Sequence, residues 1–419
     1  MKDVPACDRP LLMVQKLRQC AQRVTECKKT IRQDQVSDLV DYIPCVKEFP
    51  EKLVLLCVQM VGANVFRPLP MRSVPHGTVF DAEEDEPLLD PDWPLLHKVH
   101  EFFYRFVTSV PPKPNRKHIG PTFIVKFIEL FGSEDPRERD YVKATLHALY
   151  ARFVGHRSFI RKCLRDTLVR YVYVDSSNVG ISELLELVQS ISSGLATPLK
   201  EEHRLFFRQA ILPLLRPSNF EAFAENFRGV TDTFLEKDPA MGVDLMDAVV
   251  RYWPKFNSKK ELGFVDLCRD AVEAAGSEAS EAQKKGVVAC LAQSTLSDNF
   301  QLAQKTLSLW DKPKMQAFFE HNIRLVMGPM YAAVMQNVQG DKHWNIGVAS
   351  MSGQLSAHLR ATNRSLFTAV ADSYERDQED KARVRRERDD EWAKLSALFP
   401  SAPKAEDPVE SWLACRPTP

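Results

Sequence analysis

Apolar residues recur with helical spacing along most of this chain, and short breaks interrupt them about every twenty residues. Val142, Leu146, Leu149 and Phe153, for example, follow one another at intervals of four, three and four, which places them on one face of a helix. Similar stripes occupy 159–168, 181–191 and 206–215. The breaks carry proline, glycine or small polar residues, as at 132–136, 175–180, 197–198 and 217–219. Because strand-like alternation of any length is lacking, the pattern predicts an all-α protein.

Two such helices with their breaks take about forty residues, which is the period of HEAT and armadillo repeats. One helix pair of this size cannot bury its apolar face alone, so neighbouring pairs must stack on one another. We therefore predict a HEAT-like helical-repeat solenoid, a curved superhelix of antiparallel helix pairs with one concave face.

We assign residues 1–398 to a single solenoid that contains two unusual segments, followed by a tail. Residues 67–95 hold many prolines and the acidic run 81–87, which predicts a long acidic loop. Residues 374–397 are dominated by charges of both signs and predict an exposed helix with ion pairs between successive turns. From residue 399 to 419 the prolines predict a C-terminal tail with little fixed structure.

The overall charge argues against some classes of partner. Lys and Arg together number 56, as do Asp and Glu, so no net field draws the chain towards nucleic acid or a membrane surface. No stretch approaches about eighteen uninterrupted apolar residues, and no apolar run follows Lys2, so we expect a cytosolic or nuclear protein. The nine cysteines show no Cys-x-x-Cys spacing, and we interpret them as reduced thiols.

The sequence contains no recognisable motif of a catalytic or cofactor-binding site. Gly-x-Gly-x-x-Gly, Gly-x-x-x-x-Gly-Lys, Gly-x-Ser-x-Gly and His-Glu-x-x-His are all lacking. His97 and His100 stand three residues apart and could share a metal ion, but no Cys or carboxylate pair at ligand spacing supports them. We therefore predict a non-catalytic protein without a metal or cofactor.

Polar, aromatic and basic residues gather between residues 147 and 203. His147 and Tyr150 lie one turn apart on one predicted helix, and Arg157 follows at the next break. Because alternate helices of a HEAT stack line the same face, segments far apart in the sequence can adjoin there. The predicted groove residues are His147, Tyr150, Arg157, Glu186, Leu187, Ile191, Lys200 and His203.

Together these residues would form an apolar slot with a basic rim. The slot would consist of Tyr150, Leu187 and Ile191, and the rim of Arg157, Lys200 and His203. An extended peptide with apolar anchors and one acidic residue would fit such a slot. The alternative is that the apolar residues are ordinary inter-helix core and the basic residues a solvated rim.

Several runs of residues match one known family over nearly the whole chain, most densely from 79 to 203. They are Ser-Glu-Asp-Pro-Arg-Glu-Arg-Asp at 133–140, Leu-His at 146–147, Ile-Arg-Lys at 160–162, Glu-Leu-Leu-Glu at 183–186, Pro-Leu-Lys-Glu-Glu-His at 198–203, Glu-Glu-Asp-Glu-Pro at 83–87, Trp-Pro at 93–94, Glu-Phe-Phe at 101–103, Tyr-Trp-Pro-Lys at 252–255 and His-Trp-Asn at 343–345. With these runs the chain strongly resembles the B-prime (fifty-six-kilodalton) class of protein phosphatase 2A regulatory subunits.

The resemblance implies a non-catalytic, HEAT-like subunit that docks on a phosphatase scaffold subunit and contacts the catalytic subunit. It also implies that substrates are recruited through short LxxIxE-type motifs, held by the same eight residues that the spacing brings together. The acidic loop residues Glu83, Glu84, Asp85 and Glu86 could contact a basic surface or the catalytic subunit, or could form a plain solvated loop.

One residue beside the predicted groove departs from the family pattern. The family usually has an arginine where this chain has Ala148, next to His147. A guanidinium there would bind a phosphate or acid near the first anchor, so phosphorylation inside a motif should strengthen binding less in this chain.

A second interpretation is a HEAT-repeat adaptor outside any phosphatase, such as a transport receptor that grips basic peptides. Such a receptor would have acidic or asparagine ladders along its concave helices, whereas Arg157, Lys200 and His203 favour an acidic ligand.

Overall fold

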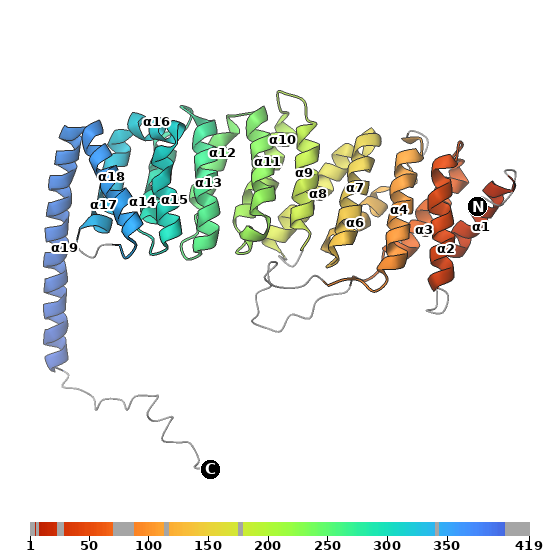
Figure 1. Cartoon of the computed structure of the whole chain (residues 1–419), viewed down its shortest axis with the longest axis horizontal. Helices are drawn as coiled ribbons and strands as arrows, with labels where there is room; N and C mark the ends of the chain where they lie inside the picture. Colours follow the sequence, from red (N-terminus) through yellow and green to blue (C-terminus); the bar gives the residue numbers. More distant parts are fainter. Residues whose placement is uncertain are drawn as a thin grey trace, which may run out of the picture. The chain divides into compact units, whose positions relative to one another are not determined.

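The computed structural model describes residues 5, 8–22, 29–69, 88–112, 117–174, 179–339 and 343–398. Every regular element within these ranges is helical (Figure 1), which confirms the predicted all-α helical-repeat fold. The acidic residues Glu83, Glu84, Asp85 and Glu86 and the tail 399–419 lie outside the described residues.

Packing divides the chain into two compact units, Met1–Val287 and Val288–Pro419. The boundary falls inside helix α14 (Glu281–Thr295). No sequence feature marks this division within the array assigned to residues 1–398, because the helical periodicity continues across it.

The first unit is built from consecutive helix pairs, each a first helix followed by a second. They are α1 (Arg9–Cys20) and α2 (Lys29–Tyr42), α3 (Glu51–Val65) and α4 (Trp93–Ser109), α6 (Pro121–Glu129) and α7 (Pro136–Arg152), α8 (Arg157–Tyr173) and α9 (Ile181–Ser193), α10 (Glu201–Phe206) and α11 (Ala224–Lys237), and α12 (Met241–Arg251) and α13 (Ser258–Ala275). A π-helical turn, Phe207–Ile211, and a 3-10 turn, Leu212–Leu215, continue α10.

The pairs stack as two rows of helices. In the row of second helices, α4 packs on α2 and α7, and α9 packs on α7 and α11. In the row of first helices, α8 packs on α6 and on the π-helical turn after α10. The red-to-green helices of Figure 1 show this side-by-side arrangement. Two layers of this kind are the architecture that a repeat of helix pairs produces.

Aromatic side chains fill the space between the rows. Phe103 and Phe106 of α4 are fully buried, as is Phe127 of α6. The rings of Phe103 and Phe127 meet edge to face at 5.3 Å between centroids, a geometry that aromatic pairs prefer. The helical spacing of these residues therefore corresponds to core positions, as the sequence pattern predicts.

Two local features set the positions of α7 and α9. The carboxylate of Asp135 accepts a hydrogen bond from the backbone N–H of Arg137 at 3.0 Å, and Pro136 opens the helix, so α7 has a capped start. A Cβ added at Gly180 would lie 2.1 Å from the carbonyl oxygen of Phe131. Only glycine fits this close approach, which brings the start of α9 against the segment before α7.

A buried ion network ties the start of α7 to the chain around α4. Arg67 donates to both carboxylate oxygens of Glu138, at 2.8 and 3.0 Å, and to Asp90 at 2.6 Å. Nε2 of His100 lies 3.1 Å from Oε1 of Glu138, and both of these side chains are fully buried. The network gives His100 a structural partner, and His97 contacts the hydroxyl of Tyr141 at 2.9 Å.

The network strongly favours the charged form of Glu138. Burial by itself raises the pKa of a carboxyl group, but the hydrogen bonds and positive charges of His100 and Arg67 outweigh it and lower the pKa of Glu138 to about 2. The same carboxylate raises the pKa of Arg67 despite its burial. Glu138 is therefore an anion over the whole physiological range.

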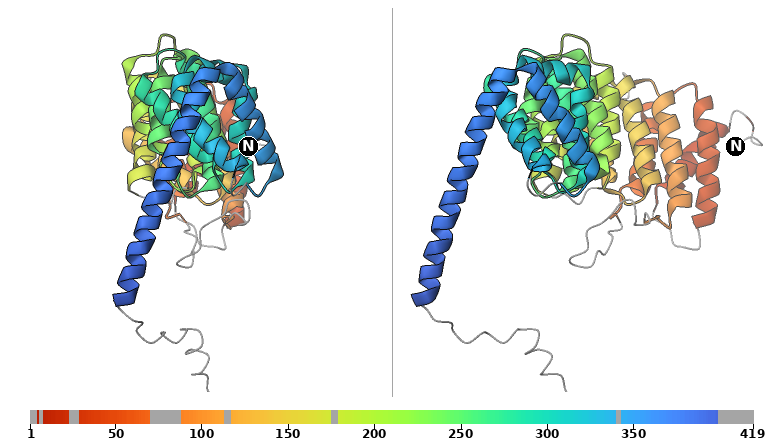
Figure 2. Two further views of the ribbon diagram at one scale, coloured as in Figure 1. Left: turned by 90° about the vertical axis from the view of Figure 1, so that its left-hand side faces the viewer. Right: turned by 60° about the vertical axis from the view of Figure 1, so that its left-hand side comes forward.

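The second unit contains α15 (Phe300–Leu307), α16 (Pro313–His321), α17 (Ile323–Val338), α18 (Ile346–Thr362) and the 35-residue α19 (Arg364–Leu398). Phe367 and Tyr374 of α19 pack edge-on against Tyr331 of α17, at 5.1 and 5.5 Å. Beyond this contact α19 extends past the other helices of its unit (Figure 2). Its side chains from 379 to 396 are exposed, and Arg383 pairs with Asp380 at 2.8 Å. This confirms the predicted exposed, ion-paired helix over 379–396, whereas Tyr374 packs on α17.

Within the described ranges, no helix combines the length and apolar composition that crossing a membrane requires. The same part of the chain holds no group of three or more His, Cys, Asp or Glu side chains arranged to bind a metal ion. Of the six cysteines that fall in the described ranges, Cys20, Cys45, Cys57 and Cys163 are free thiols.

Candidate functional site

The predicted groove residues lie near two junctions between consecutive helix pairs of the first unit, from α7 to α8 and from α9 to α10. His147 and Tyr150 are near the end of α7, and Arg157 opens α8. Glu186, Leu187 and Ile191 belong to α9, and Lys200 and His203 lie at the start of α10. The site therefore draws on both rows of helices, and not only on alternate helices of one row as the spacing argument assumed.

Most of the apolar surface expected in the slot is covered. Leu187 is 1% exposed, Ile191 6% and Tyr150 8%. Leu187 thus packs as a core residue, as in the alternative interpretation of the sequence, while His147 and Lys200 are exposed. A ligand can reach only the edges of Tyr150 and Ile191.

Arg157 holds the end of α7 together with Tyr150. Its Nε donates to the carbonyl oxygen of Tyr150 at 2.9 Å and its Nη2 to that of Ala151 at 3.0 Å. These carbonyls lie in the last turn of α7, where they have no partner within the helix. The guanidinium also lies 5.3 Å from the centroid of the Tyr150 ring, within range of a cation–π contact. Arg157 therefore fixes the position of Tyr150 in addition to carrying charge at the rim.

Arg161, one turn after Arg157 on α8, links the two halves of the site. Its Nη1 donates to the hydroxyl of Tyr150 at 3.0 Å, and its Nη2 donates to Oε1 of Glu202 at 2.9 Å. The same Glu202 oxygen lies 3.3 Å from Nε2 of His203. One guanidinium thus bridges α7 and α10, and it shares a carboxylate with the imidazole.

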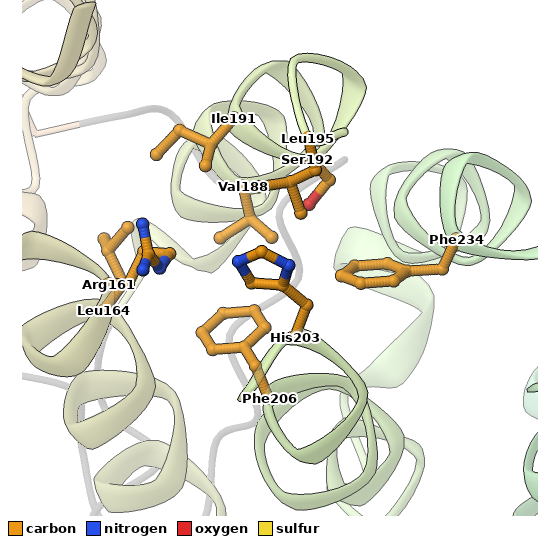
Figure 3. A pocket seen from close by; sticks show the side chains of 9 residues that line it. All are labelled: Arg161, Leu164, Val188, Ile191, Ser192, Leu195, His203, Phe206 and Phe234. Atoms are coloured by element: carbon orange, nitrogen blue, oxygen red, sulfur yellow. The ribbon is translucent and has the colours of Figure 1, made fainter. Parts of the chain in front are cut away.

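A pocket opens beside these cations. Its walls come from α8, α9, the turn after α9, α10 and α11 and are mainly apolar: Arg161, Leu164, Val188, Ile191, Ser192, Leu195, His203, Phe206 and Phe234. In Figure 3 the imidazole of His203 lies at its centre, between Val188 and Phe206, with Arg161 on one side and Phe234 on the other. The pocket thus places apolar walls beside two basic side chains.

The electrostatics of the pocket favour an anion. Burial lowers the pKa of His203, and the nearby charges of Arg161 and Lys200 lower it further, while Glu202 acts in the opposite direction. His203 is therefore more often neutral at pH 7 than a free histidine. Arg161 and Lys200 consequently supply most of the positive charge at this end.

A second ion pair lies at the other end of the groove. Nζ of Lys143 on α7 lies 2.5 Å from Oε2 of Glu186 on α9 and 3.0 Å from Oδ1 of Asp140. Glu186, a predicted groove residue, is thus neutralised by a partner that the spacing argument did not name.

Sequence reasoning missed Arg161, Glu202 and the pocket residue Phe234. Arg161 could have been found, because it follows Arg157 by one helical turn and must share its face. Phe234 could not, because it lies on α11 and reaches the pocket only through the stacking of α9 and α11.

Comparison with known proteins places the chain in a family. The family described as protein phosphatase 2A regulatory B subunit (B56 family) matches residues 1–399. Among solved structures, an engineered protein covers 86% of this chain and 92% of its own length, with a TM-score of 0.27 and 11% sequence identity. A similarity of that size does not bear on the fold.

Curated relatives agree with the family match. The chain is 32% identical over 412 residues to the human serine/threonine-protein phosphatase 2A 56 kDa regulatory subunit delta isoform, covering 95% of this chain and 68% of the relative. It is 32% identical over 408 residues to the Caenorhabditis elegans serine/threonine-protein phosphatase 2A regulatory subunit pptr-1, covering 95% and 74%. The human alpha isoform is 32% identical over 412 residues, covering 95% and 83%. This chain therefore belongs to the B56 family of protein phosphatase 2A regulatory B subunits and is a non-catalytic regulator.

Proposed function

We propose that this chain recruits substrates to a protein phosphatase 2A holoenzyme. In this proposal it binds the scaffold and catalytic subunits and holds LxxIxE-type acidic motifs of substrates in the groove between α7 and α10. Tethering raises the local concentration of phosphosites near the enzyme without altering the chemistry, which the catalytic subunit performs.

One observation carries the motif-binding part of the proposal. Arg161 and His203 converge on a single carboxylate oxygen, at 2.9 and 3.3 Å, at the edge of a pocket with apolar walls. A motif in which an apolar anchor is followed shortly by a glutamate presents those two groups together. Each buried anchor contributes about 1.5–3 kcal/mol and each charged hydrogen bond a similar amount. After ordering costs, the sum corresponds to roughly micromolar affinity.

Reconstitution tests the holoenzyme part of the proposal. The full chain, mixed with purified phosphatase scaffold and catalytic subunits, is expected to elute with both in size-exclusion chromatography. It should also accelerate dephosphorylation of a substrate that carries an LxxIxE-type motif relative to the same substrate with the motif scrambled. Elution of the chain apart from both subunits would refute the holoenzyme assignment.

The second candidate function, an adaptor outside any phosphatase, is less well supported. An adaptor for basic peptides needs acidic side chains along its groove, whereas Arg157, Arg161 and Lys200 gather here and Glu186 is paired with Lys143. Family membership also favours the phosphatase. For the acidic residues Glu83, Glu84, Asp85 and Glu86, a contact with a partner subunit and a plain solvated loop both stay open as predictions.

Phosphorylation inside the motif is expected to strengthen binding by less than about tenfold. Ala148 stands beside His147 and offers no donor, so a phosphate near the first anchor gains no bidentate guanidinium partner. Fluorescence titration with matched phosphorylated and unmodified peptides measures the ratio.

An Ala148→Arg variant provides the matched control, since it should raise the phosphopeptide ratio and leave the unmodified peptide nearly unaffected. A gain beyond tenfold in the unchanged protein would contradict this prediction.

A further inference from the structure

Glu202 occupies the position at which a ligand carboxylate would have to bind. Its Oε1 accepts a hydrogen bond from Nη2 of Arg161 at 2.9 Å and lies 3.3 Å from Nε2 of His203. These are the two basic side chains that line the pocket. The protein therefore already supplies a carboxylate to its own acid-binding groups.

Glu202 is the most exposed member of this trio. Its side chain is 54% exposed, against 21% for Arg161 and 9% for His203. Arg161 is anchored to Tyr150 through its other terminal nitrogen, whereas Glu202 lies in the first turn of α10 with water on one side. Arg161 is thus held in place by a second partner, and the more exposed carboxylate is the group that can swing aside.

A ligand carboxylate cannot bind Arg161 and His203 beside Glu202 without a cost in free energy. An incoming acid must either share the donors with Glu202, at close range to a like charge, or displace Glu202 into water. Either route lowers the affinity that Arg161 and His203 would otherwise provide. The affinity is lowered only for ligands that place an anion beside these two side chains.

We propose that Glu202 is an internal competitor for the acidic residue of bound motifs and thereby limits the affinity of the groove. The inference rests on the proposed function, because it assumes that the ligand's acid binds Arg161 and His203. It makes Glu202 a determinant of specificity: ligands without an acid at this position do not compete with it.

The chain offers a matched control in the adjacent residue. Glu201 lies in the same first turn of α10, is similarly exposed, and lies 3.6 Å from Arg208 instead of contacting Arg161. Glu201→Gln and Glu202→Gln thus remove the same charge from the same helix end. A difference in peptide affinity between the two variants therefore comes from the local contact of Glu202, because the net charge and the interaction with the helix dipole change equally in both.

The test is a titration of the full chain with two fluorescent peptides. One is an LxxIxE-type peptide, and the other carries Gln in place of its glutamate. Glu202→Gln is expected to bind the glutamate peptide roughly two- to fivefold more tightly than the unchanged protein, since surface contacts of this kind are worth up to about 1 kcal/mol, a factor of about five in affinity. Glu201→Gln should change it by less than about twofold, and the Gln peptide should bind Glu202→Gln and the unchanged protein alike.

Four results would overturn the inference, and they are distinguishable. Weaker binding by Glu202→Gln would mean that Glu202 positions Arg161 and His203 for the ligand. An equal gain for both peptides would mean a general charge effect. If the unchanged protein binds the glutamate peptide and Glu202→Gln binds it no more tightly, the proposed competition by Glu202 is refuted while the proposed function stands. If neither protein binds the glutamate peptide, the competition and the proposed motif binding are both refuted.

Discussion

The Tyr150→Ala variant is expected to bind an LxxIxE-type peptide about tenfold more weakly than the unchanged protein. Tyr150 contributes the small exposed edge of an aromatic ring, worth about 0.5 kcal/mol on burial by a ligand, and a hydroxyl that anchors Arg161, worth about 1 kcal/mol. Its ring also lies under the guanidinium of Arg157. Removing it therefore weakens the apolar part of the groove and loosens two of its cations. Fluorescence titration with the peptide measures the loss.

A second variant separates these contributions from a general loss of structure. Tyr150 is 8% exposed, so its truncation also destabilises the first unit, and far-UV circular dichroism must show that the helices persist at the temperature of the titration. Tyr150→Phe keeps the ring and removes only the hydroxyl that accepts from Arg161, and we expect it to bind about fivefold more weakly. A well-folded Tyr150→Ala variant with less than about threefold weaker binding would contradict the proposed groove.

Replacing Glu138 with alanine is expected to lower the free energy of unfolding of the first unit by about 3–5 kcal/mol. The substitution leaves Arg67 and the fully buried His100 without the carboxylate that compensates their burial, and breaking a buried ion pair on one side costs about that much. Urea denaturation followed by circular dichroism measures the change. Asp140→Ala on the same helix serves as the control. Asp140 is 64% exposed in a surface pair with Lys143, so its replacement should lower the free energy of unfolding by less than about 1 kcal/mol.

The pH dependence of stability provides an independent check on Glu138. Its pKa is about 2 in the folded protein and has an ordinary value of 4.5. A lowered folded pKa contributes stability that is fully present above about pH 4.5 and is lost as the pH falls towards 2, by about 3 kcal/mol in total. The Glu138→Ala variant should lack this component of the acid-induced loss. If the unchanged protein and the Glu138→Ala variant lose the same free energy of unfolding as the pH falls, the charge assignment of the network is refuted.

The sequence was sufficient for the fold class because amphipathic periodicity is local. Val142, Leu146 and Leu149 are buried in α7 as their spacing predicts, and the charged composition of 374–397 correctly predicted the helix that is exposed over 379–396. Each of these inferences needs only the geometry of one helix and the preference of apolar side chains for burial. The resemblance to the family was also readable from short runs of residues, and the family match confirmed it, whereas the role of the groove residues stays a prediction.

Only the tertiary structure decided how deeply each groove residue lies and which charges meet. Helical spacing tells which face Leu187 occupies, but not that its neighbours cover it to 1% exposure. Likewise, the pairing of Arg161 with Glu202 joins residues 41 positions apart, and the division of the chain inside α14 depends on which helices contact one another. These properties arise from contacts between helices, which one-dimensional periodicity does not encode, because the same amphipathic face can be covered by a neighbouring helix or left open to a ligand.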